Sequence, residues 1–177
     1  MCTSRRGFFG RSLNAGSCGV LCSLLGRFSR ANAGQTQNER PSFHVNPVGR
    51  VESRGETSHL RIFDRYHDAL LGLDGYSHIF VLYWFDQNDT PEKRRILRVH
   101  PRGNPDNPLT GVFACRAPTR PNLIGLTLCK VLSVADGIVQ VDRIDALDGT
   151  PIVDIKPYIP STDSVTGDVR MPDWLSR

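Results

Sequence analysis

The fold is decided by the stretch SHIFVLYWF, residues 77–85. Nearly every position in it is apolar or aromatic, and the run is only nine residues long. A run of this length without polar alternation is typical of a strand that is buried on both faces. We therefore expect residues 78–85 to form the central strand of a sheet.

Shorter apolar runs lie on both sides of this stretch, and Gly, Pro, Asn and Asp separate them. Such a pattern is typical of strands that are joined by turns, so the sequence predicts a mainly β fold. The further expected strands are residues 44–53, 60–62, 96–99, 111–115, 125–135, 138–146 and 152–155.

Two local signals add detail to this β-rich pattern. Residues 64–73 have an acid at their start and good helix formers after it, so they predict one short helix. Asp136-Gly137 stands between two β-rich runs, which is the strongest short-range signal of a hairpin. A chain of 177 residues with 39% hydrophobic residues has room for a single domain with its own core.

The positive net charge of +4 comes from the N-terminus. Residues 1–33 contain five arginines and no acidic residue, which leaves 17 basic against 18 acidic residues in the rest of the chain. The domain itself is thus close to neutral, and an RNA-binding face has to come from local clustering of charge. Outside the first 33 residues the cysteines are Cys115 and Cys129, without a CxxC pair or a Cys/His cluster. We expect no metal site, and we expect both cysteines to be small buried residues of strands.

Residues 1–33 have the layout of a targeting leader. Arg5-Arg6 precede a modest apolar stretch over residues 13–25, and Ala31-Asn32-Ala33 follows it. A charged start, an apolar middle and a small-residue cleavage site are typical of an export signal, and paired arginines indicate the twin-arginine type. We expect export to the periplasm, cleavage after Ala33 and a polar linker over residues 34–42. The apolar stretch is too short for a permanent membrane span. The alternative destinations are an organellar matrix, because the leader is also rich in Arg and Ser, and the cytoplasm.

The candidate chemistry lies in the segment GVFACRAPTRPNLIG, residues 111–125. Motifs of Rossmann, P-loop, nucleophile-elbow and zinc-protease enzymes are absent from the sequence. Pro118 and Pro121 restrict the backbone of this segment, and Arg116 and Arg120 lie four residues apart on it. Arginines on a rigid loop lose little entropy when they bind a carboxylate or a phosphate. The alternative is a rigid turn whose arginines pair with carboxylates of the domain.

A second polar segment is DALDGTPIVDIKPY, residues 145–158. Asp154 and Lys156 are two positions apart on an expected strand, so they share one face of it. Asp154 is suited to an ammonium group or a ribose, and Lys156 to a carboxylate or a phosphate. The alternative is an ion pair at the end of a strand.

On these residues the chain resembles the TsaA/TrmO-like methyltransferase family. Residues 111–125 match the family pattern GVFATRSPxRPNPIG, residues 148–158 match DGTPxxDIKPY, and residues 72–85 match GLxGFSHxWVLxxF. The resemblance implies a small β-barrel over residues 43–160, with a C-terminal tail over 161–177. It also implies a homodimer that binds S-adenosyl-L-methionine near the subunit interface and methylates N6-threonylcarbamoyladenosine at position 37 of tRNA.

The resemblance assigns residues to the site by motif position. No catalytic base can be named. Asp86 stands where relatives commonly have His, Leu123 where they have Pro, and the loop over residues 53–58 is much shorter than theirs. The implied cofactor contacts are Asp86, Gln87, Arg116, Leu126, Ile144 and Asp145. The residues implied to shape the site or to meet the nucleotide are Arg120, Asp154, Lys156 and Tyr158.

A function from another class stays open at this point. The short loop and the near-neutral domain are compatible with an exported binding protein that keeps the barrel and holds a small anionic ligand on its arginine loop. Such a protein would have no methyltransferase activity.

Overall fold

The computed structural model describes residues 42–175. The leader predicted over residues 1–33 and almost all of the predicted linker lie outside the described residues. In the part that is described, no helix has the length and apolar character needed to cross a lipid bilayer.

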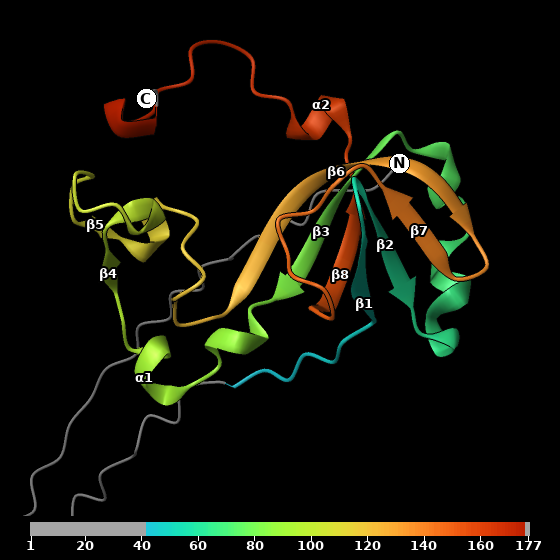
Figure 1. The fold of residues 1–177 in the computed structure, drawn as a ribbon. Helices are drawn as coiled ribbons and strands as arrows, with labels where there is room; N and C mark the ends of the chain where they lie inside the picture. The colour runs from blue at the N-terminus through green and yellow to red at the C-terminus, as the bar shows by residue number, and fades with distance from the viewer. Residues whose placement is uncertain (1–41, 176–177) are drawn as a thin grey trace, which may run out of the picture. The chain divides into compact units, whose positions relative to one another are not determined.

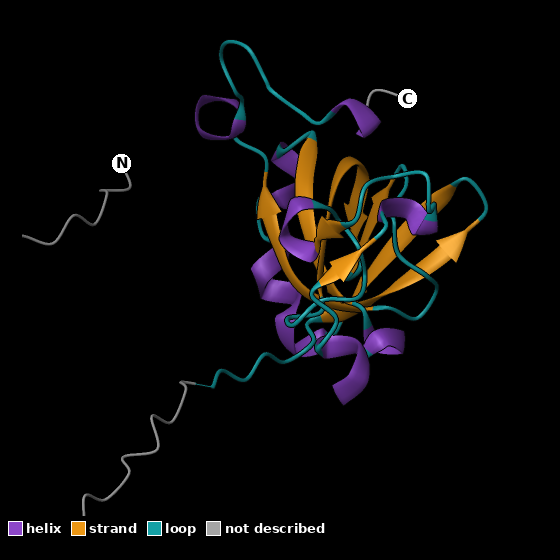
Figure 2. Cartoon of the chain, turned by 90° about the vertical axis from the view of Figure 1, so that its left-hand side faces the viewer, coloured by secondary structure: helices purple, strands orange, loops and turns teal. Residues whose placement is uncertain are grey.

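Six antiparallel strands close into a barrel in the order β1-β2-β7-β6-β3-β8 (Figure 1). Closure pairs every strand on both sides, which removes the exposed edges of an open sheet. Figure 2 shows the strands curving around one another, with the short helices outside them. The predicted mainly β barrel is confirmed. The barrel strands are β1 Gly49–Arg54, β2 Thr57–Ile62, β3 His78–Trp84, β6 Ile124–Ala135, β7 Ile138–Val141 and β8 Pro151–Pro157.

β3 lies between β6 and β8, as expected of a central strand. The expectation that both of its faces are buried is wrong. Ile79, Val81 and Tyr83 are buried in the barrel, whereas the residues between them are only partly buried. A small barrel has a single packed interior, so alternate side chains of a strand must point outward.

The core consists of inward-facing side chains from every barrel strand. Members with 0% exposed surface include Val51, Leu60, Val139 and Ile152, from β1, β2, β7 and β8. Cys129 of β6 joins them, as predicted for that cysteine. Each fully buried side chain of this size contributes about 1.5–3 kcal/mol through the hydrophobic effect.

The turn between β6 and β7 is the predicted Asp-Gly hairpin. Asp136 and Gly137 have φ angles of 52° and 73°, the left-handed conformation that a two-residue hairpin turn of this type needs. The short helix expected over residues 64–73 is instead two 3₁₀ helices, Asp64–Leu70 and Leu73–Gly75. Gly72, with a φ of 80°, lies between them and prevents a continuous helix.

Residues 86–123 leave the barrel between two neighbouring strands, and we call them the lobe. β3 and β6 pair directly where the lobe begins and ends, at Trp84 and Ile124. The strands predicted over residues 96–99 and 111–115 are shorter than expected and pair only with each other. The lobe contains α1 Pro91–Arg94, β4 Arg98–Val99 and β5 Thr110–Gly111, and α2 Pro160–Asp163 follows the barrel.

Candidate functional site

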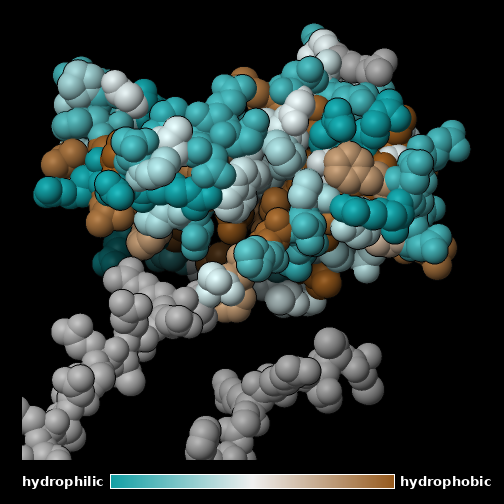
Figure 3. Space-filling model, turned by 90° about the horizontal axis from the view of Figure 1, so that it is seen from below, coloured by the Kyte–Doolittle hydropathy of each residue, from teal (hydrophilic) through white to brown (hydrophobic). Residues whose placement is uncertain are grey.

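A pocket of about 360 Å³ lies where the lobe meets the barrel. It is lined by three segments: the end of β3 with the turn after it, the segment before β8, and the loop with Pro118 and Pro121, which we call the proline-rich loop. In the view from below, hydrophobic residues lie between the hydrophilic surfaces of the lobe and of the barrel (Figure 3). Five of the six residues implied as cofactor contacts line it: Asp86, Gln87, Arg116, Ile144 and Asp145.

The two arginines of the proline-rich loop have different surroundings. Arg116 is exposed, and its side chain makes no hydrogen bond or ion pair with any residue that the structure describes. Arg120 instead donates to the carbonyl oxygens of Val112 and Cys115, at 2.9 Å in the second case. Neither arginine pairs with a carboxylate of the described chain. Arg120 therefore holds the loop in shape, and Arg116 is left to meet a ligand.

Another arginine of the lobe, Arg94, fixes the lobe to the barrel. Arg94 Nε lies 2.7 Å from Asp89 Oδ1, and its Nη1 donates to the carbonyl oxygen of Pro121 at 2.9 Å. Its guanidinium group also lies over the ring of Trp84, whose indole N–H donates to Asp89 at 3.0 Å. Hydrogen bonds from Arg94 and then from Trp84 lower the pKa of Asp89. These contacts tie the start of the lobe to its end, next to the segments 86–88 and 116–118 that line the pocket.

Tyr83 forms the floor of the pocket, and the reasoning from sequence did not single it out. Its hydroxyl donates to the backbone carbonyl of Asp145 at 2.6 Å and lies 3.2 Å from Thr127 Oγ1. Burial raises the pKa of Tyr83, so the hydroxyl stays neutral and remains a donor. The ring packs directly against Gly125, where any Cβ would collide with it. Tyr83 thus joins the barrel wall to the segment that carries Ile144 and Asp145.

The chemistry of the lining fits S-adenosyl-L-methionine, the cofactor that the resemblance implies. Phe85 and Ile144 give apolar surface for a base, and the ring of Phe85 lies 5.5 Å from that of Tyr83. Arg116 is suited to a carboxylate, because its guanidinium can bind both oxygens. The exposed carboxylates of Asp86 and Asp145 are suited to an ammonium group and to ribose hydroxyls. Small-molecule sites typically combine apolar walls with a few polar groups in this way.

Three residues of β8 and the segment after it, predicted for the site, lie away from the pocket. Asp154 and Lys156 form an ion pair at 2.8 Å, and Asp154 also accepts from the backbone of Ile155. Tyr158 packs on Phe80 and reaches Ser164 with its hydroxyl at 2.8 Å. Asp154 and Lys156 therefore match the alternative of an ion pair on a strand, and Tyr158 connects β8 to the segment after it.

Leu126 is the remaining predicted cofactor contact, and it does not line the pocket. It lies on the outer face of β6, opposite Leu82 of β3, with 44% of its surface exposed. Leu126 is thus not among the residues that a ligand in the pocket of the same chain would contact.

The short loop predicted between the first strands is a two-residue turn. Arg54 pairs with Thr57 across it, and Gly55 has a φ of 64°. The backbone N–H of Ser53 donates to Asp148 Oδ1 at 2.9 Å. This contact fastens the hairpin to the segment that lines the pocket, but the hairpin itself contributes no lining residue.

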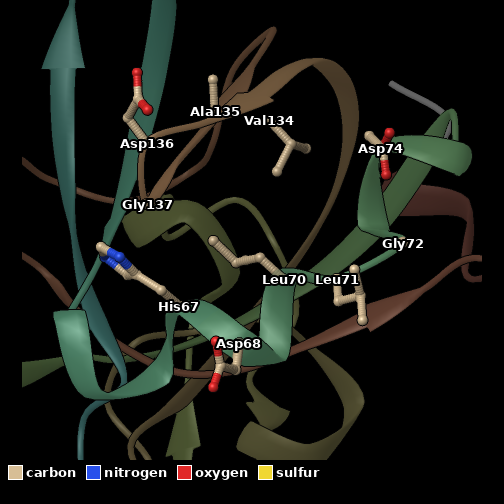
Figure 4. A pocket seen from close by; sticks show the side chains of 10 residues that line it. All are labelled: His67, Asp68, Leu70, Leu71, Gly72, Asp74, Val134, Ala135, Asp136 and Gly137. Atoms are coloured by element: carbon tan, nitrogen blue, oxygen red, sulfur yellow. The ribbon is translucent and has the colours of Figure 1, made fainter.

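A larger hollow of about 610 Å³ lies elsewhere, between the first 3₁₀ helix and the β6–β7 hairpin (Figure 4). It shares no residue with the pocket above. His67 in its wall contacts the carbonyl oxygen of Ile62 at 3.1 Å, so this ring binds the backbone.

Within residues 42–175, no three His, Cys, Asp or Glu side chains are placed to hold a metal ion. Cys115, predicted on a strand, is half-buried in the loop before Arg116.

The comparisons with known proteins agree with the motifs. The family model of the tRNA-methyltransferase O N-terminal domain matches residues 41–164. A probable S-adenosyl-L-methionine-binding protein of Methanocaldococcus jannaschii is 45% identical over 121 residues, which are 68% of this chain and 96% of the relative. The human tRNA (adenine(37)-N6)-methyltransferase is 42% identical over 104 residues, which are 59% of this chain and 23% of that enzyme.

The solved structures give the same relationship. A crystal structure of TrmO from Pseudomonas aeruginosa has a TM-score of 0.60 and 30% sequence identity. The match covers 78% of this chain, and the chain spans 64% of the length of that protein. Since the family model covers well over half of the sequence, the chain belongs to the tRNA-methyltransferase O family, as its three motifs predicted.

Proposed function

We propose that this protein is an S-adenosyl-L-methionine-dependent methyltransferase that acts on tRNA. The observation that carries the proposal is the pocket in which Asp86, Gln87, Arg116, Ile144 and Asp145 converge, with the guanidinium of Arg116 free to bind. The names of the relatives, as cofactor-binding proteins and as tRNA methyltransferases, support it.

The roles of the side chains follow from their charges and positions. Arg116 binds the carboxylate of the cofactor, and the carboxylates of Asp86 and Asp145 bind its ammonium group or its ribose. S-adenosyl-L-methionine would supply a methyl group carried on a positively charged sulfur. When the N6 nitrogen of adenosine bonds to the methyl carbon, the carbon–sulfur bond breaks, S-adenosyl-L-homocysteine leaves and the nitrogen gives up its proton to solvent. The task of this chain is to hold the two reactants in that alignment, which supplies most of the acceleration in reactions between two bound groups.

Calorimetric titration of the full chain with S-adenosyl-L-methionine tests the proposal. Saturable binding in folded protein is expected, and Arg116→Ala should weaken it. Methyl transfer from radiolabelled cofactor to total tRNA is the second measurement. Folded protein that binds no cofactor contradicts the proposal.

We infer that the methylated nucleoside is N6-threonylcarbamoyladenosine at position 37. The support is the set of three motifs shared with the family, in particular residues 111–125 and 148–158. Mass spectrometry of digested tRNA should show the methylated nucleoside only when the tRNA already carries the threonylcarbamoyl group. Equal methylation of tRNA that lacks this group would assign unmodified adenosine as the substrate instead.

We propose that the protein acts as a homodimer through the outer face of β6 and β3. Leu126 and Leu128 are 44% and 47% exposed there, in a row with the outer side chains of β3. An apolar sheet face of this kind is unfavourable in water unless a partner covers it. Across such an interface, Leu126 could reach the pocket of a second copy. Analytical ultracentrifugation should detect a dimer, and Leu128→Glu should yield monomers.

The second candidate function is a binding protein for a small anionic ligand. The observation in its favour is the two-residue turn at Gly55, which replaces a longer loop of the family and adds nothing to the pocket. Native mass spectrometry of protein purified from its own compartment distinguishes the two functions. A retained anion other than the cofactor or its demethylated product favours the binding protein.

We further propose that residues 1–33 direct export through a twin-arginine route. Arg5-Arg6, the weak apolar stretch and Ala31-Asn32-Ala33 support this proposal. N-terminal sequencing of the exported fraction should begin at Gly34, and replacing both arginines with lysine should retain the precursor inside. A cytoplasmic product with its leader intact would contradict export and would place enzyme, cofactor and tRNA in one compartment.

A further inference from the structure

The charges of the described chain are segregated between the lobe and the rest. The lobe, residues 86–123, carries seven Lys and Arg against four Asp and Glu. The remaining described residues carry eight against thirteen. The nearly neutral total is therefore made up of a basic lobe and an acidic remainder, and a polyanion is attracted more strongly to the lobe.

Three arginines of the lobe are available to a partner. Arg95, Arg98 and Arg102 are exposed, and their side chains make no hydrogen bond or ion pair within residues 42–175. Arg102 has a φ of 59°, a left-handed conformation that is unfavourable for a residue with a Cβ. Asn107 stabilises this loop, because it donates to the carbonyl of Pro101 at 2.9 Å and accepts from His100 at 2.7 Å. The loop thus presents Arg102 on a backbone that is already ordered.

Exposed apolar side chains lie next to the ladder of β4 and β5, which carries Arg98. Phe113 is 85% exposed and Leu97 is 59% exposed. The segments that carry them are adjacent, since the N–H of Val112 donates to the carbonyl of Leu97 at 3.0 Å and Arg98 pairs with Gly111 in the ladder of β4 and β5. An exposed aromatic ring on a segment that also carries exposed arginines is a common surface for an unpaired base and its phosphates.

We propose that this face of the lobe binds a single-stranded loop of RNA, with Phe113 stacking on a base and Arg98 and Arg102 contacting phosphates. The inference rests on the proposed function, in which tRNA is the substrate, and it adds the surface that holds it. Phe113 lies in the 3₁₀ helix Val112–Ala114, and Arg116 follows two residues after the end of this helix. A base that stacks on Phe113 is therefore held three residues along the chain from Arg116, which lines the cofactor pocket.

The salt dependence of RNA binding tests the role of the arginines. The probe is an RNA hairpin with an unpaired loop, and the protein is the full chain. Each phosphate contact on a single strand adds about 0.7 to the slope of log K against log salt, so Arg98→Gln with Arg102→Gln should lower the slope by about 1.4. Arg50→Gln with Arg65→Gln, two exposed arginines of the barrel region, is the matched control and should leave the slope unchanged. Equal effects of the two pairs would overturn the proposal.

Substitution of Phe113 tests stacking separately from charge. Phe113→Ala should weaken binding of the looped hairpin between about 5- and 150-fold, and Phe113→Trp should retain it. Phe43→Ala is the control, since Phe43 is 86% exposed outside the lobe. A blunt RNA duplex should bind less tightly and should not distinguish Phe113→Ala from the natural chain.

Two outcomes separate this inference from the proposed function. Polyglutamate that binds the lobe as tightly as the hairpin does would overturn the RNA surface in favour of an acidic protein partner, while cofactor titration still reports on the pocket. RNA binding that depends on Phe113 and Arg98 in a chain that binds no cofactor would keep the surface and reject the methyltransferase. The lobe variants should bind S-adenosyl-L-methionine normally, because none of these residues lines the pocket.

Discussion

The replacement Tyr83→Phe removes one oxygen atom from the floor of the pocket and leaves the ring in place. The lost hydroxyl donates to the carbonyl of Asp145 at 2.6 Å, and this bond ties the segment 144–145 to the barrel. Thr127 loses a second partner at 3.2 Å. The ring still packs on Phe85 and Gly125, so the variant should fold.

The magnitude follows from the contacts that are lost. A hydrogen bond of this kind contributes about 0.5–1.5 kcal/mol, and the abandoned carbonyl can regain water because Asp145 is exposed. We expect the free energy of unfolding to fall by about 1 kcal/mol, or about 4 °C in Tm. Burial raises the pKa of Tyr83 above its usual 10.0, so this contribution is fully present below pH 10 and is lost as the pH rises through the higher value.

The assay compares stability with cofactor affinity in the same variant. Urea unfolding reports the first, and calorimetric titration with S-adenosyl-L-methionine should show affinity weaker by up to about 10-fold, since one hydrogen bond positions the segment that binds it. Thr127→Val, which removes only the weaker contact, is the control and should leave affinity unchanged. Full affinity in Tyr83→Phe with lowered stability would refute a positioning role for this hydroxyl.

Three further changes test the site and the core. Arg116→Ala should weaken cofactor binding by about 1.5–3 kcal/mol with Tm nearly unchanged. Arg116→Lys should restore little of this affinity, because a point charge cannot bind two oxygens in a fork. A titration that shows intact affinity in Arg116→Ala contradicts the assigned role of Arg116. Gly125→Ala should lower the free energy of unfolding by about 1–3 kcal/mol, measured in urea, because the new Cβ collides with the ring of Tyr83. Burial raises the pKa of the Cys129 thiol from 9.0 to about 12, with Asp142 as the smaller cause, so its contribution to stability is present below pH 9 and is lost as the pH rises towards 12. Cys129→Ala should therefore be less stable than the natural chain at neutral pH, but its free energy of unfolding, measured in urea, should fall less between pH 9 and 12.

Local signals in the sequence predicted the features that depend on few residues. The apolar run at residues 78–84 is a strand, because no helix of that length would bury such a run. Asp136-Gly137 is a turn, because both residues tolerate a left-handed backbone. The prediction that both faces of β3 are buried was wrong. The composition of a strand does not tell whether its sheet is covered by a layer on each side or closes into a barrel.

The parts of the site that were missed depend on pairing between distant strands. In the sequence, Tyr83 is not distinguished from the apolar residues around it. Only the barrel places its hydroxyl next to the carbonyl of Asp145, 62 residues further along the chain. In β8 an irregularity shifts the register, so that Ile152 pairs with Tyr83 and Asp154 with Leu82. Asp154 therefore lies beside outward-facing residues, although it is only four positions from Thr150, which lines the pocket.

The lobe begins and ends on two residues that already face each other, Trp84 and Ile124. The ladder between β3 and β6 thus continues to its last pair whatever the chain does between these points. Insertions, deletions or a complete exchange of residues 86–123 would alter the ligand surface without moving a single strand register. The barrel can stay the same while the substrate specificity changes, because the pairing of the barrel strands depends little on the sequence of the lobe.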